Sequence, residues 1–269
     1  VTRLYTAERE GAAWTRFLVP LPDNGTIGIA AADPFRPELF VTYTSFLVPT
    51  TLSLIAKPGA KAEALKSLPP RFNADGLEAT QLEATSADGT KVPYFLVRRK
   101  DAPVDGATPT LLYGYGGFQV VYGPFYLETQ GKAWLERGGA YALANIRGGG
   151  EFGPGWHQAA LKKNRPRAYE DFEAVAMNLI ERKLTSSRRL GIMGGSNGGL
   201  LVGAAMTRKP ELYRAVVCQV PLLDMTRYHK LLAGHSWMGE YGDPEGEERE
   251  AILGYSPYQN LKKGVAYPR

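Results

Sequence analysis

Cysteine and histidine are both scarce in this sequence of 269 residues, which contains one cysteine and three histidines. A single cysteine cannot form a disulfide within the sequence. The sequence also contains neither a cysteine pair nor a His-Glu-x-x-His run, the patterns that would indicate a zinc site. The apolar run 215–220 contains Cys218, so we expect a small core side chain there rather than a nucleophile. No metal ion is predicted, and the lack of disulfides suits the cytoplasm slightly better than the bacterial periplasm.

Long hydrophobic runs are missing as well, because no stretch approaches the roughly 18 apolar residues that cross a membrane. The net charge of +5 comes from scattered lysines and arginines, so we expect neither nucleic acid nor a membrane as a partner. None of the glycine-rich loops is a convincing nucleotide-binding motif, and no cofactor is expected. With 44% hydrophobic and 22% charged residues, the composition is typical of a globular protein, which we expect to be monomeric.

Residues 1–75 and 76–269 differ in their pattern. The first segment holds β-rich runs at 14–19, 39–44 and 51–55, each bounded by turn-forming residues. We expect four or five short strands there. A segment of this length would struggle to bury a core unaided, so it is interpreted as the end of a larger β structure.

The second segment alternates between predicted strands and helices. A hairpin is expected around the turn 87–90, and apolar residues at helical spacing predict an amphipathic helix over 171–183. Further helices are expected at 127–136 and 200–206, and further strands at 110–113, 140–145, 190–193 and 215–220. This alternation predicts an α/β fold, with a mostly parallel sheet covered by helices on both faces.

Three glycine-rich loops, 114–118, 147–150 and 194–199, each follow a predicted strand. Because the carboxyl ends of parallel strands meet at one edge of a sheet, a functional site is expected where these loops meet. The third loop, Gly-Gly-Ser-Asn-Gly-Gly, matches the G-x-S-x-G pattern of a nucleophile elbow and stands between a strand and a helix. The pattern alone is weak, but its context favours Ser196 as an exposed nucleophile.

Four motifs together resemble those of the prolyl oligopeptidase family of serine peptidases. They are the runs at 111–118, 145–153, 194–201 and 234–242, and they occur in the order found in that family. The resemblance extends from about Leu82 to the end of the sequence. It implies an α/β-hydrolase fold over 76–269, and residues 44–49 resemble the closing blade of the family's β-propeller.

The resemblance also implies roles for individual residues. Ser196 matches the nucleophile that attacks the carbonyl carbon after proline. Asn197 matches the residue whose backbone N–H stabilises the oxyanion, and Tyr115 matches the tyrosine whose hydroxyl provides the second donor. The lining of the proline pocket corresponds to Phe118, Leu222, Trp237 and Tyr241. The family often has valine at the position of Leu222.

Each of these side chains also has a plainer interpretation. Tyr115 could be an aromatic residue at the end of a strand, and Trp237 and Tyr241 could be core aromatics. The elbow sequence Ser-Asn-Gly-Gly, taken with these two aromatics, favours the branch of the family that cleaves short peptides after proline. In that branch no metal or cofactor is needed.

The acid and the base of a catalytic triad are not apparent. A hydrolase of this fold needs an aspartate and then a histidine after the serine, and Asp224 with His229 is a local pair whose spacing fits neither position. We expect this sequence to be part of a longer enzyme that carries both. A related peptidase or esterase of different specificity, or a non-catalytic peptide-binding protein, is the alternative.

Overall fold

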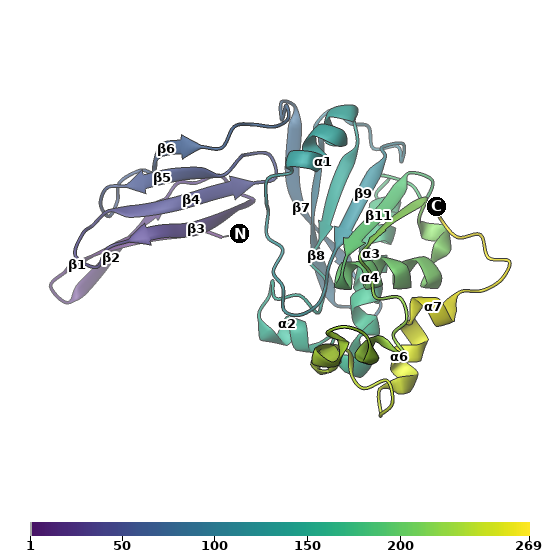
Figure 1. Ribbon diagram of the computed structural model, residues 1–269. Helices are drawn as coiled ribbons and strands as arrows, with labels where there is room; N and C mark the ends of the chain where they lie inside the picture. Colours follow the sequence, from purple (N-terminus) through teal and green to yellow (C-terminus); the bar gives the residue numbers. More distant parts are fainter. Residues whose placement is uncertain (1) are drawn as a thin grey trace. The chain divides into compact units, whose positions relative to one another are not determined.

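The computed structural model describes residues 2–269, which form two compact units (Figure 1). One unit comprises residues 2–80 together with 123–137, and the other comprises residues 81–122 together with 138–269. Within the described residues, no helix combines the length and apolar character needed to cross a membrane.

The first unit is built from antiparallel strands. A hairpin joins β1 (Leu4–Glu10) to β2 (Ala13–Val19), and a four-stranded sheet has the order β3-β4-β5-β6. The strands of this sheet are β3 (Gly25–Ala32), β4 (Leu39–Ser45), β5 (Thr51–Ile55) and β6 (Glu63–Ser67). The three strands predicted from β-rich runs are confirmed as β2, β4 and β5. The six strands exceed the four or five expected, and the sequence did not indicate β1, β3 or β6. Of these, β3 is rich in glycine and alanine, residues with little preference for strands.

Residues 123–137 pack on this first unit. The Thr26 hydroxyl donates to the carbonyl oxygen of Pro124 over 2.7 Å, and the Phe46 and Phe125 rings lie 6.0 Å apart. The helix expected over 127–136 is shorter than predicted, because α1 (Glu128–Ala133) ends before a separate 3₁₀ turn over Leu135–Arg137.

The second unit contains a six-stranded sheet in the order β12-β11-β9-β10-β8-β7. Its strands are β7 (Leu77–Thr85, which begins in the first unit), β8 (Lys91–Arg99), β9 (Thr110–Gly114), β10 (Ala140–Ala144), β11 (Leu190–Gly195) and β12 (Ala215–Gln219). The strands β10, β9, β11 and β12 run parallel to one another, whereas β8 is antiparallel to β10. The predicted α/β class and the hairpin formed by β7 and β8 are therefore confirmed.

Two helices pack against the sheet of the second unit and bury its core. The first, α3 (Pro166–Glu181), begins five residues earlier than predicted at a proline, whose fixed φ suits the first turn of a helix. The second, α4 (Asn197–Arg208), follows β11. Both helices pack closely on β9 at Gly114. A Cβ on this glycine would lie within 3 Å of Phe172 from α3 and of Leu201 from α4. Shorter helices follow the sheet elements: α2 (Pro154–Gln158), α5 (Met238–Tyr241), α6 (Arg249–Tyr255) and α7 (Pro257–Asn260).

The expectation that Cys218 is a buried core residue is wrong, since its side chain is exposed. The strand itself forms as predicted, but β12 is at the edge of the sheet, and three of its five residues are exposed. An apolar run indicates a strand without showing whether a helix covers both of its faces.

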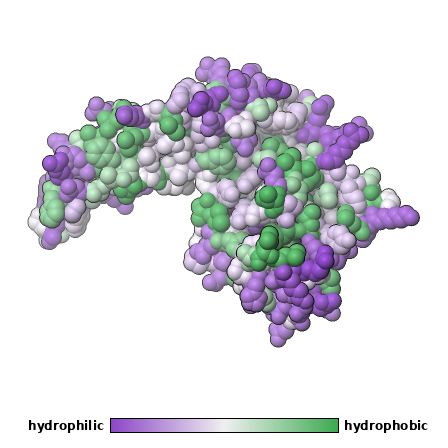
Figure 2. Space-filling view, viewed as in Figure 1, coloured by the Kyte–Doolittle hydropathy of each residue, from purple (hydrophilic) through white to green (hydrophobic). Residues whose placement is uncertain are grey.

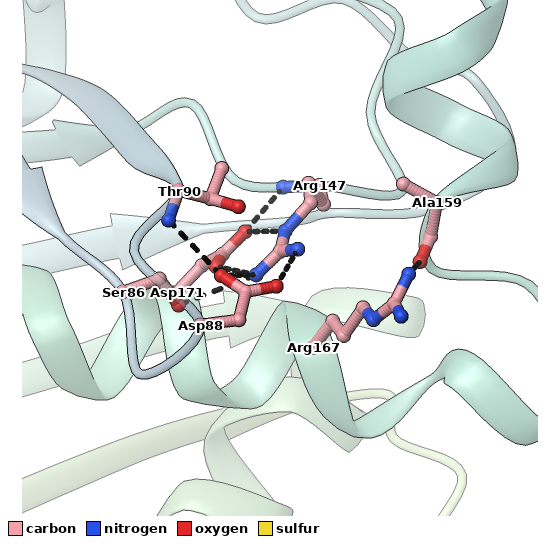
Figure 3. Close-up of polar contacts among 7 residues, drawn as sticks. All are labelled: Ser86, Asp88, Thr90, Arg147, Ala159, Arg167 and Asp171. Atoms are coloured by element: carbon pink, nitrogen blue, oxygen red, sulfur yellow. Dashed lines mark hydrogen bonds and ion pairs between the residues drawn. The ribbon is translucent and has the colours of Figure 1, made fainter.

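Arg147, from the glycine-rich loop after β10, joins three elements of the second unit (Figure 3). Its side chain is 4% exposed and forms ion pairs with Asp171 of α3 and with Asp88 in the β7–β8 turn. Close hydrogen bonds to Arg147 hold the pKa of Asp88 well below its usual value. Nearby, Arg167 donates to the carbonyl oxygen of Ala159 and fastens the start of α3. This loop is therefore an anchor for the edge where the other two glycine-rich loops meet.

Candidate active site

Ser196 lies at the turn between β11 and α4, with the unusual backbone angles φ 57° and ψ −119°. A residue with a side chain rarely adopts a positive φ, so the surroundings must hold this turn in place. The Ser196 N–H donates to the carbonyl oxygen of Gln219 over 3.0 Å, and its carbonyl accepts the N–H groups of Gly199 and Leu200. The residue is exposed at the positive end of a 12-residue helix.

Two glycines allow the turn to approach its neighbours. A Cβ at Gly194 would lie 2.1 Å from the carbonyl oxygen of Gly198, and a Cβ at Gly198 would lie 2.8 Å from that of Gly114. Both obstacles are backbone atoms, so no side-chain movement could relieve the contact. The strand, sharp turn and helix are the structural context that the G-x-S-x-G pattern requires.

A cavity of about 130 Å³ opens beside Ser196. Its walls are the six residues Tyr115, Phe118, Ser196, Leu222, Trp237 and Tyr241. The Phe118 and Tyr241 rings meet edge to face, with centroids 5.6 Å apart. The structure therefore brings together six of the seven residues singled out in the sequence, in an aromatic slot that suits a flat apolar group.

Tyr115 borders this cavity from the loop after β9. Burial raises the pKa of its phenol above the usual value, and a hydrogen bond with Ser196 offsets part of this effect. The phenol is consequently protonated at neutral pH and can donate a hydrogen bond. A donor beside the serine is what a developing oxyanion needs.

Asn197, the seventh residue, lies behind the cavity and is fully buried. Its side-chain Oδ1 accepts hydrogen bonds from Arg165 Nη2 over 2.5 Å and from the Tyr241 hydroxyl over 2.9 Å. Its Nδ2 donates to the carbonyl oxygen of Tyr115 over 2.5 Å. The side chain thus joins three parts of the site, while its backbone belongs to the first turn of α4.

The sequence did not single out Arg165 and Glu240, which complete this buried network. Arg165 Nη1 donates to Glu240 Oε1 over 2.9 Å, and the same oxygen accepts the backbone N–H of Phe118 over 2.8 Å. His157 Nε2 lies 2.7 Å from the other carboxylate oxygen. Glu240 lies within the motif at 234–242, between the predicted pocket residues Trp237 and Tyr241. This position is the feature of the sequence that could have indicated a role in the site.

The described residues include all three histidines, and none of them hydrogen-bonds to Ser196. His157 contacts Glu240, His229 Nε2 lies 3.7 Å from Glu245, and His235 is exposed. Asp224 binds Thr226, Arg227 and Gln259 rather than His229. Burial alone would raise the pKa of Asp224, but these hydrogen bonds lower it to about 2. The two residues do not form a catalytic pair, as expected from their spacing.

A second cavity, of about 260 Å³, shares Ser196, Leu222 and Trp237 with the first. Its other walls are mostly apolar: Val220, Pro221, Leu223, Asp224, Tyr228, Leu231 and Leu232. Hydrophobic residues also gather on the face of this unit seen in Figure 2. Ser196 therefore borders both cavities, and the mostly apolar walls of the second give room for a bound chain beyond the aromatic slot.

A family model described as the prolyl oligopeptidase family matches residues 126–269. The chain belongs to the prolyl oligopeptidase family. The sheet and the turn at Ser196 in this chain are accordingly those of the α/β-hydrolase fold found in prolyl oligopeptidases.

Individual relatives agree with this family. The chain is 55% identical, over 95% of its length, to an uncharacterised peptidase of Sinorhizobium fredii and 38% identical, over 93%, to a prolyl endopeptidase of Elizabethkingia miricola. It superposes on a post-proline cleaving enzyme from Rickettsia typhi with a TM-score of 0.89, at 43% identity over 99% of its length.

The chain spans only part of these prolyl oligopeptidase relatives. It covers 35% of the Sinorhizobium fredii peptidase, 36% of the Elizabethkingia miricola enzyme and 39% of the Rickettsia typhi structure. The chain therefore corresponds to little more than a third of the length of each of these relatives.

Proposed function

We propose that this chain is the nucleophile-bearing part of a serine oligopeptidase that cleaves short peptides on the carboxyl side of proline. The observation that carries the proposal is the aromatic cavity of about 130 Å³, which has Ser196 and Tyr115 in its wall. A pyrrolidine ring is flat and apolar and fits between aromatic faces. Relatives named prolyl endopeptidase support the same specificity.

In this mechanism Ser196 Oγ forms a bond with the carbonyl carbon of the proline residue. The serine proton passes to a base, and the carbonyl electron pair moves onto the oxygen. The Tyr115 hydroxyl and the Asn197 backbone N–H are proposed to bind that oxyanion. The C–N bond then breaks, the amine leaves with the proton, and water hydrolyses the acyl-enzyme.

The base and its orienting acid are proposed to come from sequence beyond residue 269. The short coverage of the relatives supports this assignment, as does the lack of a hydrogen bond between Ser196 and His157, His229 or His235. Short proline-containing peptides are the proposed substrates, and a monomer is the proposed state. We also propose that residues 1–75 form the end of a β-propeller, followed by the catalytic domain over 76–269.

The test begins with intact mass and fluorophosphonate labelling of the purified source protein. A mass well above the 29.4 kDa of this chain, with the label on Ser196 and none on a Ser196→Ala variant, is expected. Fluorogenic peptides with proline before the scissile bond should then be cleaved in preference to matched alanine peptides.

Other outcomes would reassign the protein. Cleavage of esters without a preference for proline would favour a related hydrolase of different specificity. A mass near 29.4 kDa with no label would favour a peptide-binding role without turnover, because removal of the base in a serine peptidase costs on the order of 10⁶ in kcat.

A further inference from the structure

A buried ion pair lies behind the aromatic cavity, and its charges take no part in the proposed bond making. Arg165 is fully buried and Glu240 is 5% exposed. Removing two charges from water costs several kcal/mol per ion, and apolar residues of similar volume often stabilise a fold at least as well. Stability is therefore a weak reason for placing this pair here.

The two partners hold different parts of the site. Glu240 Oε1 accepts the backbone N–H of Phe118 over 2.8 Å, while Arg165 Nη2 donates to Asn197 Oδ1 over 2.5 Å. Asn197 then reaches the carbonyl oxygen of Tyr115, also over 2.5 Å. One ion pair consequently fastens both ends of the loop 115–118 and the side chain that follows the nucleophile.

The form of the arginine side chain matters to this arrangement. Its planar guanidinium directs one nitrogen to Glu240 and another to Asn197. A lysine ammonium carries the same charge on one nitrogen and lacks this fixed fork. The planar guanidinium also contacts the aromatic ring of Tyr241, since its carbon lies 5.3 Å from the ring centroid. Arginine suits such a contact with an aromatic ring better than lysine does.

Resting on the proposed function, we propose that the Arg165–Glu240 pair is a positioning device that sets the oxyanion donors against Ser196. Both residues act through others: Arg165 through Asn197, and Glu240 through the loop 115–118 that carries Tyr115, which it holds at the backbone N–H of Phe118. Neither lines the cavity that would receive the substrate. The pair should therefore matter more to the transition state than to the binding of the ground state.

Two ligands separate these effects in the complete protein carrying Arg165→Lys. When a peptide aldehyde ending in prolinal binds, Ser196 Oγ forms a bond with its carbonyl carbon and the C=O electron pair moves onto the oxygen. That oxygen either takes up the serine proton or remains an oxyanion while the base holds the proton. The matching peptide alcohol fills the pocket without this addition. We expect aldehyde affinity and kcat to fall about 10- to 100-fold, with alcohol affinity and KM nearly unchanged.

Arg167→Lys is the matched control, because this exposed arginine two residues away donates to Ala159 and does not touch the site. It should behave as the wild type does. Equal losses of both ligands in Arg165→Lys, or wild-type affinity for both, would overturn the positioning role. If the wild-type protein neither binds the aldehyde nor takes a fluorophosphonate label, the proposed function itself fails.

Glu240→Gln is the second variant, since it keeps the side-chain volume and a carbonyl oxygen for Phe118 while removing the charge. The same selective loss of aldehyde affinity is expected. Thermal unfolding monitors both variants. If neither folds, the pair serves stability and the positioning assignment is overturned.

Discussion

At the scale of single residues, Tyr115 is the sharpest test of the proposed oxyanion site. Tyr115→Phe removes the hydroxyl and keeps the ring in the cavity wall. We expect kcat for a proline peptide to fall by about 10² to 10³, with little change in KM, because the hydrogen bond to the oxyanion forms only in the transition state. Steady-state kinetics measures this split. A variant with a raised KM and an unchanged kcat would make Tyr115 a wall of the pocket alone.

The same phenol predicts a pH dependence. Burial raises the pKa of Tyr115, and the partial compensation by Ser196 leaves it above the usual value. The phenol therefore keeps its proton up to about pH 10, the ordinary value for tyrosine. We expect the wild-type rate profile to show no alkaline loss from Tyr115 below that pH. If Tyr115→Phe removed an alkaline limb lying between pH 7 and 9, this assignment would be wrong.

Residues with a local pattern could be predicted, and residues whose role depends on distant partners could not. Ser196 was identified because its neighbouring glycines must admit backbone atoms at close range. Arg165 and Glu240 are 75 positions apart, and charged side chains are usually expected at the surface. Their burial follows only from tertiary structure. Asn197 was assigned for its backbone, and its side-chain bridge was not foreseen.

At the scale of elements, the turn between β11 and α4 should tolerate no side chain at Gly194. A Cβ there would lie 2.1 Å from the carbonyl oxygen of Gly198. We expect Gly194→Ala to cost at least about 1–3 kcal/mol of stability and to abolish labelling of Ser196. Gly191→Ala, on the same strand, is the control because its nearest contact is an ordinary 3.7 Å. Equal labelling of both variants would contradict the geometry.

The anchor between the β7–β8 turn and α3 should make stability depend on acid pH. Hydrogen bonds to Arg147 lower the pKa of Asp88 in the folded state, so this carboxylate stabilises the fold above its unfolded pKa of about 3.8. That contribution is lost as the pH falls below about 4 towards the folded-state pKa. Asp88→Asn should therefore flatten the loss of stability in this range, as measured by chemical unfolding. Asp105→Asn, at an exposed carboxylate, should leave it unchanged.

Element boundaries followed the strength of the apolar pattern. The helix over 171–183 was found because Phe172, Val175 and Leu179 are all fully buried on one face. Its first turn was missed although Ala168 and Tyr169, both fully buried, continue the stripe at helical spacing before Phe172, because the neighbouring Arg167 and Glu170 are charged. β3 was missed because it contains Gly25 and Gly28, which leave room for the side chains of Tyr43 and Thr42 on the neighbouring strand. Glycine is not a residue that indicates a strand in the sequence.

At the scale of the whole molecule, the two units should differ in local stability. All five residues of β10 are buried, whereas β1 and β2 are mostly exposed. Hydrogen exchange followed by mass spectrometry should therefore find the slowest amides in β9, β10 and β11 and the fastest in the β1–β2 hairpin. Peptides from the hairpin that exchange as slowly as β10 would show that another surface covers it in solution.

The α/β class and the meeting of the glycine-rich loops could be predicted because strands that alternate with helices pair in parallel, which places their carboxyl ends at one edge of the sheet. The position of β12 at the edge could not, and the misplacement of Cys218 followed from it. Nor did local pattern predict that 123–137 packs with the first unit, because such packing depends on contacts distant in sequence.

The strained turn at residue 196 has a consequence for protein engineering. Its conformation is imposed by glycine neighbours and backbone hydrogen bonds, not by the hydroxyl that it displays. The proposed nucleophile, the Ser196 hydroxyl, can thus be exchanged while the backbone of the turn is kept. A thiol installed by Ser196→Cys would form a thioester in place of an ester, and an incoming amine could then compete with water for the acyl group. The same turn could in this way hold a side chain that joins peptides instead of hydrolysing them.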